Sequence, residues 1–358
     1  MNSSVANASI IKIARQARGL SQVQLSVAAG VSQAAVSKLE AGIMQPTPEL
    51  VESLAQVLSF PASLFYETDP VFGVPVSISY RKRASVGARS IDQLEADINI
   101  RLMHLRRLLG SMDHQPELSF PSLDVDAYGG SGTAIAQLVR RHWGVPSGPL
   151  LDLTSLVERA GVIVLPCEFE SIGVDGLTLQ PPGLPVCIFL NSAMPGDRQR
   201  FTLAHELGHA VMHRMPTPEM EQQADDFAAE LLMPAKDIMP AFTSGVTLAR
   251  VAALKPIWRV SMASLIYRAR TLGCLTTSQN TSLWRQMSAL GYRRQEPQEV
   301  AVPAEKPSVM SDIIRAHVDE LGYSLDDLAR LLHMQRDELN GMYGIELRPS
   351  APRLRVVK

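Results

Sequence analysis

The sequence has few of the features that mark membrane, secreted or disulfide-stabilised proteins. It has no uninterrupted apolar run of about 18 residues, which a membrane-spanning helix would need. Its first residues, MNSSVANASIIKIARQARG, lack the basic, apolar and small-residue succession of a signal peptide. The only cysteines are Cys167, Cys187 and Cys274, without C-x-x-C spacing, so neither a disulfide framework nor a cysteine-based zinc site is expected. These absences favour a reducing cytoplasm.

An excess of charge of one sign is also missing. The chain has 34 basic and 36 acidic residues and a formal net charge of -2. Any contact with nucleic acid must therefore come from a local patch, because the whole molecule has no strong basic field. With 358 residues, 46% of them hydrophobic, the chain is long enough to bury two or three cores, which predicts a soluble multi-domain protein.

The pattern of apolar residues and turn residues predicts an α+β protein that is mostly α. Capped runs at helical spacing dominate, and two β-branched runs at 161–165 and 185–190 are expected to pair in one small sheet. We expect the second run to be core with one open edge, and an edge strand that binds an extended peptide is the alternative. The predicted divisions are a helical domain (1–70), a linker and connecting helix (71–120), an α+β domain (121–240), a helical extension (241–294), a Pro-bearing linker (295–307) and a small helical C-terminal module (308–358).

Residues 21–42, SQVQLSVAAGVSQAAVSKLEAG, have the pattern of a helix-turn-helix. Leu25 and Val36 supply apolar side chains between two helices, and the small residues Ala29 and Gly30 lie where these helices approach. Residues 8–67 as a whole resemble the Cro/repressor-like helix-turn-helix family. The DNA-binding residues that this resemblance implies are Gln22, Ser32, Gln33, Ala34, Ser37 and Lys38.

The chemistry of these side chains suits DNA, since glutamine can contact adenine with two hydrogen bonds and lysine can contact guanine or a phosphate. DNA-binding domains of this family commonly bind paired half-sites, so a homodimer is expected. However, residues 1–67 contain equal numbers of basic and acidic side chains. A helical module that contacts protein is therefore the alternative. The basic run Arg81-Lys82-Arg83 could add phosphate contacts, or could simply be a solvated linker face.

The C-terminal module repeats part of this pattern at an offset of 303 residues. The offset maps Ser21 onto Ser324 and Leu25 onto Leu328, and it maps Val31 and Val36 onto Met334 and Leu339 in the same way. A true repeat and a chance match of two amphipathic helices both explain this spacing. Because Asp337 and Glu338 fall where the N-terminal copy has alanines, and acidic residues repel phosphates, this module is interpreted as a partner-binding or dimerising piece.

The sequence RFTLAHELGHAVMH contains an H-E-x-x-H motif formed by His205, Glu206 and His209. Four residues of helix bring the two histidines to within about 40° of each other, so both imidazoles can bind one Zn²⁺. Glu206 at the edge of this face can accept a proton from metal-bound water as a general base. His213 lies about 12 Å from His205 along the helix axis, too far for one ion to join all three histidines.

A catalytic zinc needs a third protein ligand, and the following helix offers carboxylates in EQQAD. We expect Glu221 to be the ligand, with Glu219 as the alternative. Asp225, one turn after Glu221, is expected to accept a hydrogen bond from a liganding imidazole and to fix its orientation. An ordinary solvated helix face is the alternative reading of both carboxylates. His213, Tyr267 and Arg268 are all candidates for the group that stabilises the oxyanion, and no spacing rule selects one of them.

The run from Arg200 to Pro234 is similar to the ImmA/IrrE family of zinc-dependent metallo-endopeptidases, and the likeness covers about residues 130–240. The resemblance implies a zincin-like, minimal gluzincin-like domain with His205, His209 and Glu221 on zinc and Glu206 as the base. Family members cleave or otherwise inactivate helix-turn-helix repressors and so release stress-response or mobile-element genes. In this chain the N-terminal helix-turn-helix domain, called the reader domain below, could be the substrate of the peptidase, the part that directs the protein to DNA, or both.

Two functions are consistent with these residues. The first is a zinc endopeptidase that regulates transcription and cleaves a repressor-type protein or itself. The second is a DNA-binding regulator whose peptidase-like domain senses a metal or ligand without cleaving. The presence of Glu206 favours the first, because a pure sensor does not need a general base.

Overall fold

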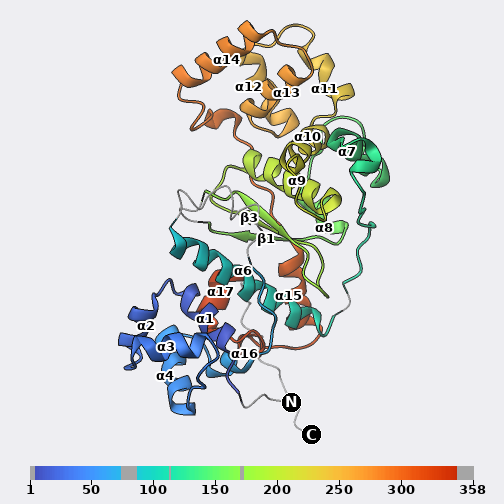
Figure 1. Cartoon of the computed structure of the whole chain (residues 1–358). Coiled ribbons are helices and arrows are strands. Elements are labelled where there is room, and N and C mark those ends of the chain that lie inside the picture. The colour runs from blue at the N-terminus through green and yellow to red at the C-terminus, as the bar shows by residue number, and fades with distance from the viewer. Residues whose placement is uncertain (1–4, 74–86, 113, 170–172, 345–358) are drawn as a thin grey trace. The chain divides into compact units, whose positions relative to one another are not determined.

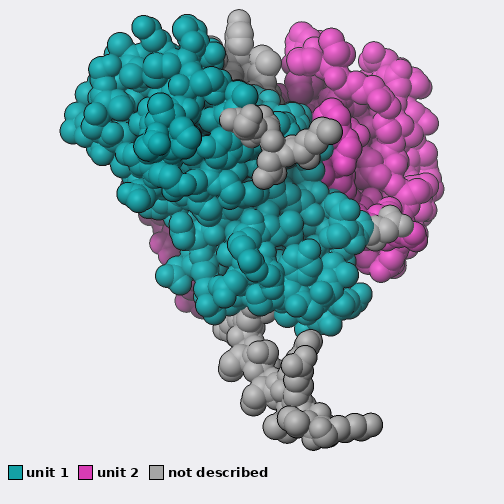
Figure 2. All heavy atoms as spheres, turned by 90° about the horizontal axis from the view of Figure 1, so that it is seen from below, with its two compact units in different colours: residues 1–74, 82–113, 309–358 teal, residues 75–81, 114–308 magenta. Residues whose placement is uncertain are grey.

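The computed structural model describes residues 5–73, 87–112, 114–169 and 173–344. It divides into two compact units, which Figure 2 shows in different colours. The first unit consists of residues 1–74, 82–113 and 309–358, and the second of residues 75–81 and 114–308. The predicted fold class, mostly helical with one small sheet and a helical N-terminal domain, is confirmed. No helix within the described ranges is long and apolar enough to span a membrane.

The first unit begins with the predicted helix-turn-helix region (Figure 1). Ser21, Ser32 and Thr47 each accept a hydrogen bond from a backbone N–H in the first turn of the helix that follows, which fixes where three of the helices start. Their apolar faces form a shared core that includes Leu25 and Val36, as expected from the sequence. The elements of this region are α1 (Ala8–Ala17), α2 (Gln22–Ala28), α3 (Gln33–Glu40), α4 (Pro48–Leu58) and the 3-10 helix η1 (Ala62–Tyr66).

The connecting helix α6 (Ala88–Leu109) packs against α1. Its buried residues Ala96, Ile100 and Met103 join the core of the helix-turn-helix region. The helix is therefore part of the first unit's body. The basic run Arg81-Lys82-Arg83, proposed for phosphate contacts, lies outside the described residues.

The C-terminal helices of the first unit repeat the backbone pattern of α2 and α3. These helices are α15 (Val309–Asp319), α16 (Leu325–Leu331) and α17 (Arg336–Tyr343), and the last two start and end 303 residues after α2 and α3. Ser324, like Ser21, is an N-cap with a reciprocal capping box. His333 has a positive φ of 50°, at the position where Gly30 has 67°. The repeated spacing in the sequence thus has a structural counterpart in the turn as well as in the helices.

These C-terminal helices are bound to the N-terminal part of the first unit by polar contacts. Glu338 on α17 forms an ion pair with Arg18, with 2.7 Å between Oε1 and Nη1. His333 Nδ1 lies 2.8 Å from the hydroxyl of Ser63 on η1. The partner of the acidic α17 therefore includes the reader domain of the same chain.

The sheet of the second unit has the order β1-β3-β2, with β1 (Ile163–Cys167), β2 (Gly176–Leu179) and β3 (Cys187–Asn191). β3 runs parallel to β1 and antiparallel to β2. The predicted pairing of the two apolar runs is confirmed, but the expected open edge on the second run is wrong, because β3 is hydrogen-bonded on both sides. The edge strands of the described sheet are β1 and β2. β2 was not predicted, since GLTL is short and has one fully buried residue.

Within the second unit, α9 lies against β2 and β3, and α8 lies against β1 (Figure 1). Trp258, Met262, Leu265 and Ile266 are buried in the main core, which agrees with their helical spacing. Gly132 is required where α7 meets α10, because a Cβ there would lie 2.0 Å from the backbone oxygen of Gln223. The helices of this unit are α7 (Gly132–His142), α8 (Leu153–Arg159), α9 (Gly196–Met212), α10 (Met220–Leu232), α11 (Ala235–Phe242), α12 (Leu248–Trp258), α13 (Met262–Thr271) and α14 (Thr277–Ala289), with 3-10 helices η2 (Asp126–Tyr128) and η3 (Gln298–Val300).

The polar segment 295–307 is anchored to the second unit at both ends. Glu296 Oε2 accepts hydrogen bonds from the Lys255 ammonium at 2.5 Å and from a backbone N–H of α13. Glu305 Oε2 accepts hydrogen bonds from both the backbone N–H and the hydroxyl of Thr154, at 2.8 and 2.9 Å. Glu305 also forms an ion pair with Arg200 of α9, and the two side chains are only 6% and 1% exposed. Two acidic residues of this polar, Pro-bearing segment, Glu296 and Glu305, therefore attach it to the second unit, while Glu299 is exposed.

We predict that Glu305→Ala lowers the free energy of unfolding of the second unit by about 3–5 kcal/mol, because it leaves the buried Arg200 guanidinium without its carboxylate. Urea denaturation followed by tryptophan fluorescence measures this change. Glu299→Ala, an exposed glutamate in the same segment, is the control and should have little effect. Equal stability of the two variants would show that the segment is not anchored through Glu305.

Candidate functional site

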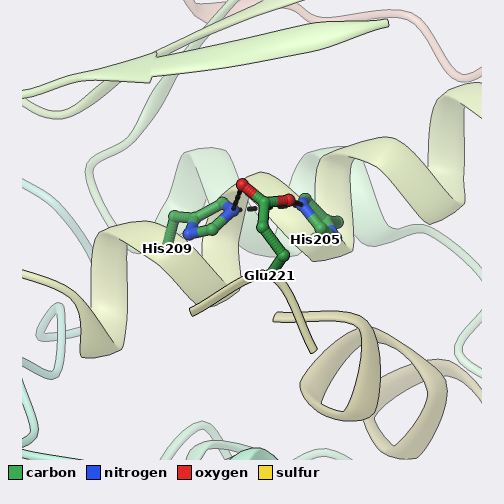
Figure 3. A group of neighbouring side chains, drawn as sticks. All are labelled: His205, His209 and Glu221. Atoms are coloured by element: carbon green, nitrogen blue, oxygen red, sulfur yellow. Dashed lines mark hydrogen bonds and ion pairs between the residues drawn. The ribbon is translucent and has the colours of Figure 1, made fainter. Parts of the chain in front are cut away.

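Three potential metal ligands meet between α9 and α10 (Figure 3). His205 and His209 lie one turn apart on the same face of α9, with 3.0 Å between their Nε2 atoms. Glu221, near the start of α10, points between them. Its Oε2 lies 3.4 Å from His205 Nε2, and its Oε1 lies 3.9 Å from His209 Nε2.

The chemistry and spacing of this group fit a zinc ion. Two imidazole nitrogens and one carboxylate oxygen are a known ligand set of catalytic zinc sites. Donors bound tetrahedrally at about 2.0–2.1 Å lie roughly 3.4 Å apart, close to the observed 3.0–3.9 Å. Glu221 belongs to this group, whereas the alternative Glu219 is the N-cap residue of α10 and is not a member.

His205 and His209 each have a hydrogen-bond partner on the outer ring nitrogen, Nδ1. Asp225 Oδ1 lies 2.8 Å from His205 Nδ1, where the sequence predicts a carboxylate that orients an imidazole. His213 Nδ1 lies 2.9 Å from His209 Nδ1. Gln223 Oε1 in turn lies 2.9 Å from His213 Nε2. No role was predicted for Gln223. Its place in EQQAD, between Glu221 and Asp225, was the signal that could have identified it.

The expected general base, Glu206, is held by a residue that sequence reasoning missed. Thr178 on β2 lies within hydrogen-bonding distance of both the backbone oxygen of Glu206, at 3.0 Å, and its Oε2, at 2.8 Å. Burial raises the pKa of the Glu206 carboxyl. A raised pKa makes this carboxylate a better proton acceptor than an exposed glutamate.

His205 and His209 have opposite pKa shifts. Burial disfavours the charged form of His205, but the hydrogen bonds to Asp225 and Glu221 outweigh it and raise the pKa to about 9. Burial and the neighbouring charge of His205 lower the pKa of His209 to about 3. The carboxylates thus favour the protonated form of His205, and burial together with the charge of His205 favours the neutral form of His209.

A glycine allows α9 and α10 to approach closely at this point. A Cβ on Gly208, between the two histidines, would lie 3.0 Å from Cδ1 of Phe227 and 3.4 Å from Cα of Ala224 on α10. The N-terminal end of α9 is held by the buried carboxylate of Asp197, which pairs with Lys255. These contacts place α9 and α10 so that Glu221 reaches the histidine pair.

Two of the three candidates for oxyanion stabilisation are engaged elsewhere. His213 is bound to His209 and Gln223. Arg268 is buried, pairs with Glu230 and donates to the backbone oxygen of Met233. Tyr267 is 47% exposed. Because His213 and Arg268 already have these partners, their contacts do not support a role for either residue in stabilising the oxyanion.

The proposed DNA-binding residues cluster around the start of α3. Gln33, Ala34 and Lys38 are exposed and Ser37 is half-buried, while Ser32 caps the helix through the backbone N–H of Ala35.

Gln33 donates to Gln22 at 2.9 Å, and Gln22 donates to Glu40 at the same distance. Glu40 also accepts two hydrogen bonds from Arg15, which joins the exposed glutamines to a nearly buried ion pair. Gln22 and Gln33 are therefore held in fixed positions.

Two family models match the chain. Residues 11–65 match the helix-turn-helix family, and residues 157–270 match the family described as an IrrE N-terminal-like domain, Peptidase_M78. The chain joins a helix-turn-helix domain to an IrrE-like domain. Both parts of the resemblance predicted from the sequence are thus confirmed, and the IrrE-like match contains α9 and α10 with the three clustered ligands. A search of curated proteins finds no match.

We predict that Gly208→Ala destabilises the IrrE-like domain by about 1–3 kcal/mol, because the added methyl group pushes Phe227 and α10 away from α9. Urea denaturation of the metal-free protein tests this. The control is Gly341→Ala, a helical glycine with no atom within 4 Å of the added Cβ, which should be neutral or stabilising. An unchanged stability of Gly208→Ala would contradict close packing at this glycine.

Proposed function

We propose that the protein is a zinc-dependent endopeptidase coupled to transcriptional regulation. It binds DNA through the helix-turn-helix domain and cleaves a repressor-type helix-turn-helix protein or itself. The observation that carries this proposal is the grouping of His205, His209 and Glu221 beside the buried carboxylate of Glu206. The IrrE-like match over residues 157–270 supports it independently.

His205, His209 and Glu221 would hold the zinc ion, and the three protein ligands leave a position for water or substrate. Bound zinc lowers the pKa of water and polarises the scissile carbonyl. Asp225 orients His205 by accepting the hydrogen bond from its Nδ1–H. A hydrolytic role explains the whole set better than metal sensing, because a sensor has no use for Glu206.

Glu206 is the proton carrier in this mechanism. Thr178 donates to Oε2 and so restrains the carboxylate at the edge of the site. Oε1 accepts the proton from the attacking water, and the same oxygen delivers it to the nitrogen of the leaving amine. The buried setting of Glu206 strengthens it as a base for the first transfer.

The edge strand β2 supports the binding of an extended peptide. It is paired only with β3 in the described sheet, and its Thr178 contacts Glu206. A peptide added to the free side of β2 would use backbone hydrogen bonds, as peptides do when they extend a sheet. This choice replaces β3, which the sequence suggested.

On the DNA side, Gln33 and Lys38 are exposed on α3, the helix that enters the major groove in helix-turn-helix domains. The balanced charge of this domain implies modest affinity for a single copy. We therefore propose that a homodimer binds paired half-sites. A helix-turn-helix substrate in the same cell, or this chain itself, would couple proteolysis to promoter release.

We predict that Glu206→Gln retains zinc but lowers the rate of cleavage by about 10²–10⁴-fold, because the amide cannot accept the proton. Glu221→Ala should lose zinc. Elemental analysis measures the metal, and intact-mass spectrometry of the zinc-loaded chain, alone and with denatured casein, measures cleavage.

Unchanged cleavage by Glu206→Gln would reject the role of the base. A zinc-loaded wild type that cleaves neither itself nor casein nor a repressor-type protein would favour the non-cleaving sensor. Absence of zinc after reconstitution would reject the metal site itself.

We predict that Gln33→Ala lowers affinity for the selected operator by about 1–3 kcal/mol and relaxes preference at one base pair. Lys38→Ala should reduce the slope of log affinity against log salt by about 1 if Lys38 contacts a phosphate. Selection from random DNA followed by titration at several salt concentrations tests both. Gln56→Ala, exposed on α4, is the control, and equal effects at positions 33 and 56 would contradict the assignment of α3.

A further inference from the structure

We propose that Gln223 and His213 form a hydrogen-bond relay that fixes the tautomer of His209, so that its Nε2 lone pair faces the metal site. His213 joins the other two residues through its two ring nitrogens: Nε2 lies 2.9 Å from Gln223 Oε1, and Nδ1 lies 2.9 Å from His209 Nδ1. The inference rests on the proposed zinc site and adds two positioning residues to it.

The direction of the relay follows from the acceptor at its outer end. The oxygen Oε1 of Gln223 can only accept, so His213 must carry its proton on Nε2. In a neutral imidazole the other nitrogen then has a lone pair, so Nδ1 of His213 accepts from Nδ1–H of His209. This leaves Nε2 of His209 without a proton and free to bind a metal.

The same reasoning applies to the other histidine from the opposite end. The carboxylate of Asp225 accepts the Nδ1–H of His205, which leaves the Nε2 lone pair of neutral His205 on the inner side. The two inner Nε2 atoms lie 3.0 Å apart. Two lone pairs at this distance repel each other unless a proton or a metal cation lies between them. By accepting the Nδ1–H protons, Asp225 and His213 thus leave two lone pairs that favour a cation between the histidines.

The position of Gln223 is determined by its packing. A Cβ on Gly132 of α7 would collide with the backbone oxygen of Gln223, so the two backbones are in close contact. On the other side of the amide, a Cβ on Gly130 would lie 3.5 Å from Nε2 of Gln223. The amide nitrogen therefore faces the Gly130 turn while the amide oxygen faces His213.

Through the relay, side chains of α10 determine the orientation of both histidines of α9. Glu221 supplies a ligand, while Asp225 and Gln223 orient His205 and His209 from the same helix. Removing an orienting partner of this kind typically costs about 10–100-fold in metal affinity. An uncharged relay at His209 also avoids a fourth carboxylate near a site that already contains Glu206, Glu221 and Asp225.

Zinc affinity of variants, measured by competition with a chelator, tests the relay energetically. Gln223→Leu and His213→Leu should each weaken zinc binding by about 10–100-fold. Gln223→Glu, which still accepts from His213, should bind zinc at least as tightly as the wild type. His213→Asn retains an oxygen near the position of Nδ1 and should recover much of the loss. Gln222→Leu is the control: Gln222 is exposed, its amide donates to Asp226 at 3.0 Å, and its loss should leave zinc affinity unchanged.

Nitrogen-15 NMR of the metal-free full chain tests the proton positions directly. We expect an Nε2–H tautomer for His213 and a proton on Nδ1 of His209, with the His213 signal changed in Gln223→Leu and kept in Gln223→Glu. A His213 that carries its proton on Nδ1 in the wild type, or a Gln223→Leu variant with wild-type zinc affinity, would overturn the relay.

The two readouts separate failure of the relay from failure of the proposed function. Expected tautomers in a protein that does not bind zinc would reject the zinc site and leave the relay standing. Tight zinc binding with the opposite tautomers would reject the relay alone. Circular dichroism at the temperature of the assays shows whether each variant is folded.

Discussion

The contact between α9 and α10 is the constraint on which the candidate site depends. Neither helix can hold a metal ion alone, since α9 supplies two imidazoles and α10 supplies the carboxylate. The helices approach closely because residue 208 is a glycine against Phe227. α10 is in turn fixed by α7 at Gly132. The arrangement of the candidate ligands thus depends on backbone packing at the small residues where the helices cross.

The sequence predicted the parts of the structure that local physics determines. α7 (Gly132–His142) is one of the expected capped runs, because its serine cap and its helical apolar pattern lie within one short stretch of the chain. The H-E-x-x-H spacing predicted which side chains share a face of α9, and Glu221 was chosen because its helix follows directly. The capped helices of the helix-turn-helix domain were predicted for the same reason.

Features that depend on contacts distant in the sequence were missed. β2 has only four residues, and its role is visible only from its pairing with β3 and from the contact of Thr178 with Glu206. Segment 295–307 was predicted to be a linker from its polar, Pro-bearing sequence. The sequence does not show that Glu305 is buried, because its partner Arg200 is far away along the chain. Gln223 has no motif of its own, and the histidine that it bonds is ten residues away.

The first unit is discontinuous, since residues 309–344 return to the reader domain after the chain has formed the second unit. The returning helices bond to Arg18, Ser63 and His104 of the N-terminal part. Consequently, a single cut between the reader and the IrrE-like domain would leave the fragments joined, because the returning helices are covalently attached to one fragment and bound to the other. If the chain is its own substrate, release of the reader requires a second cut or the loss of these contacts.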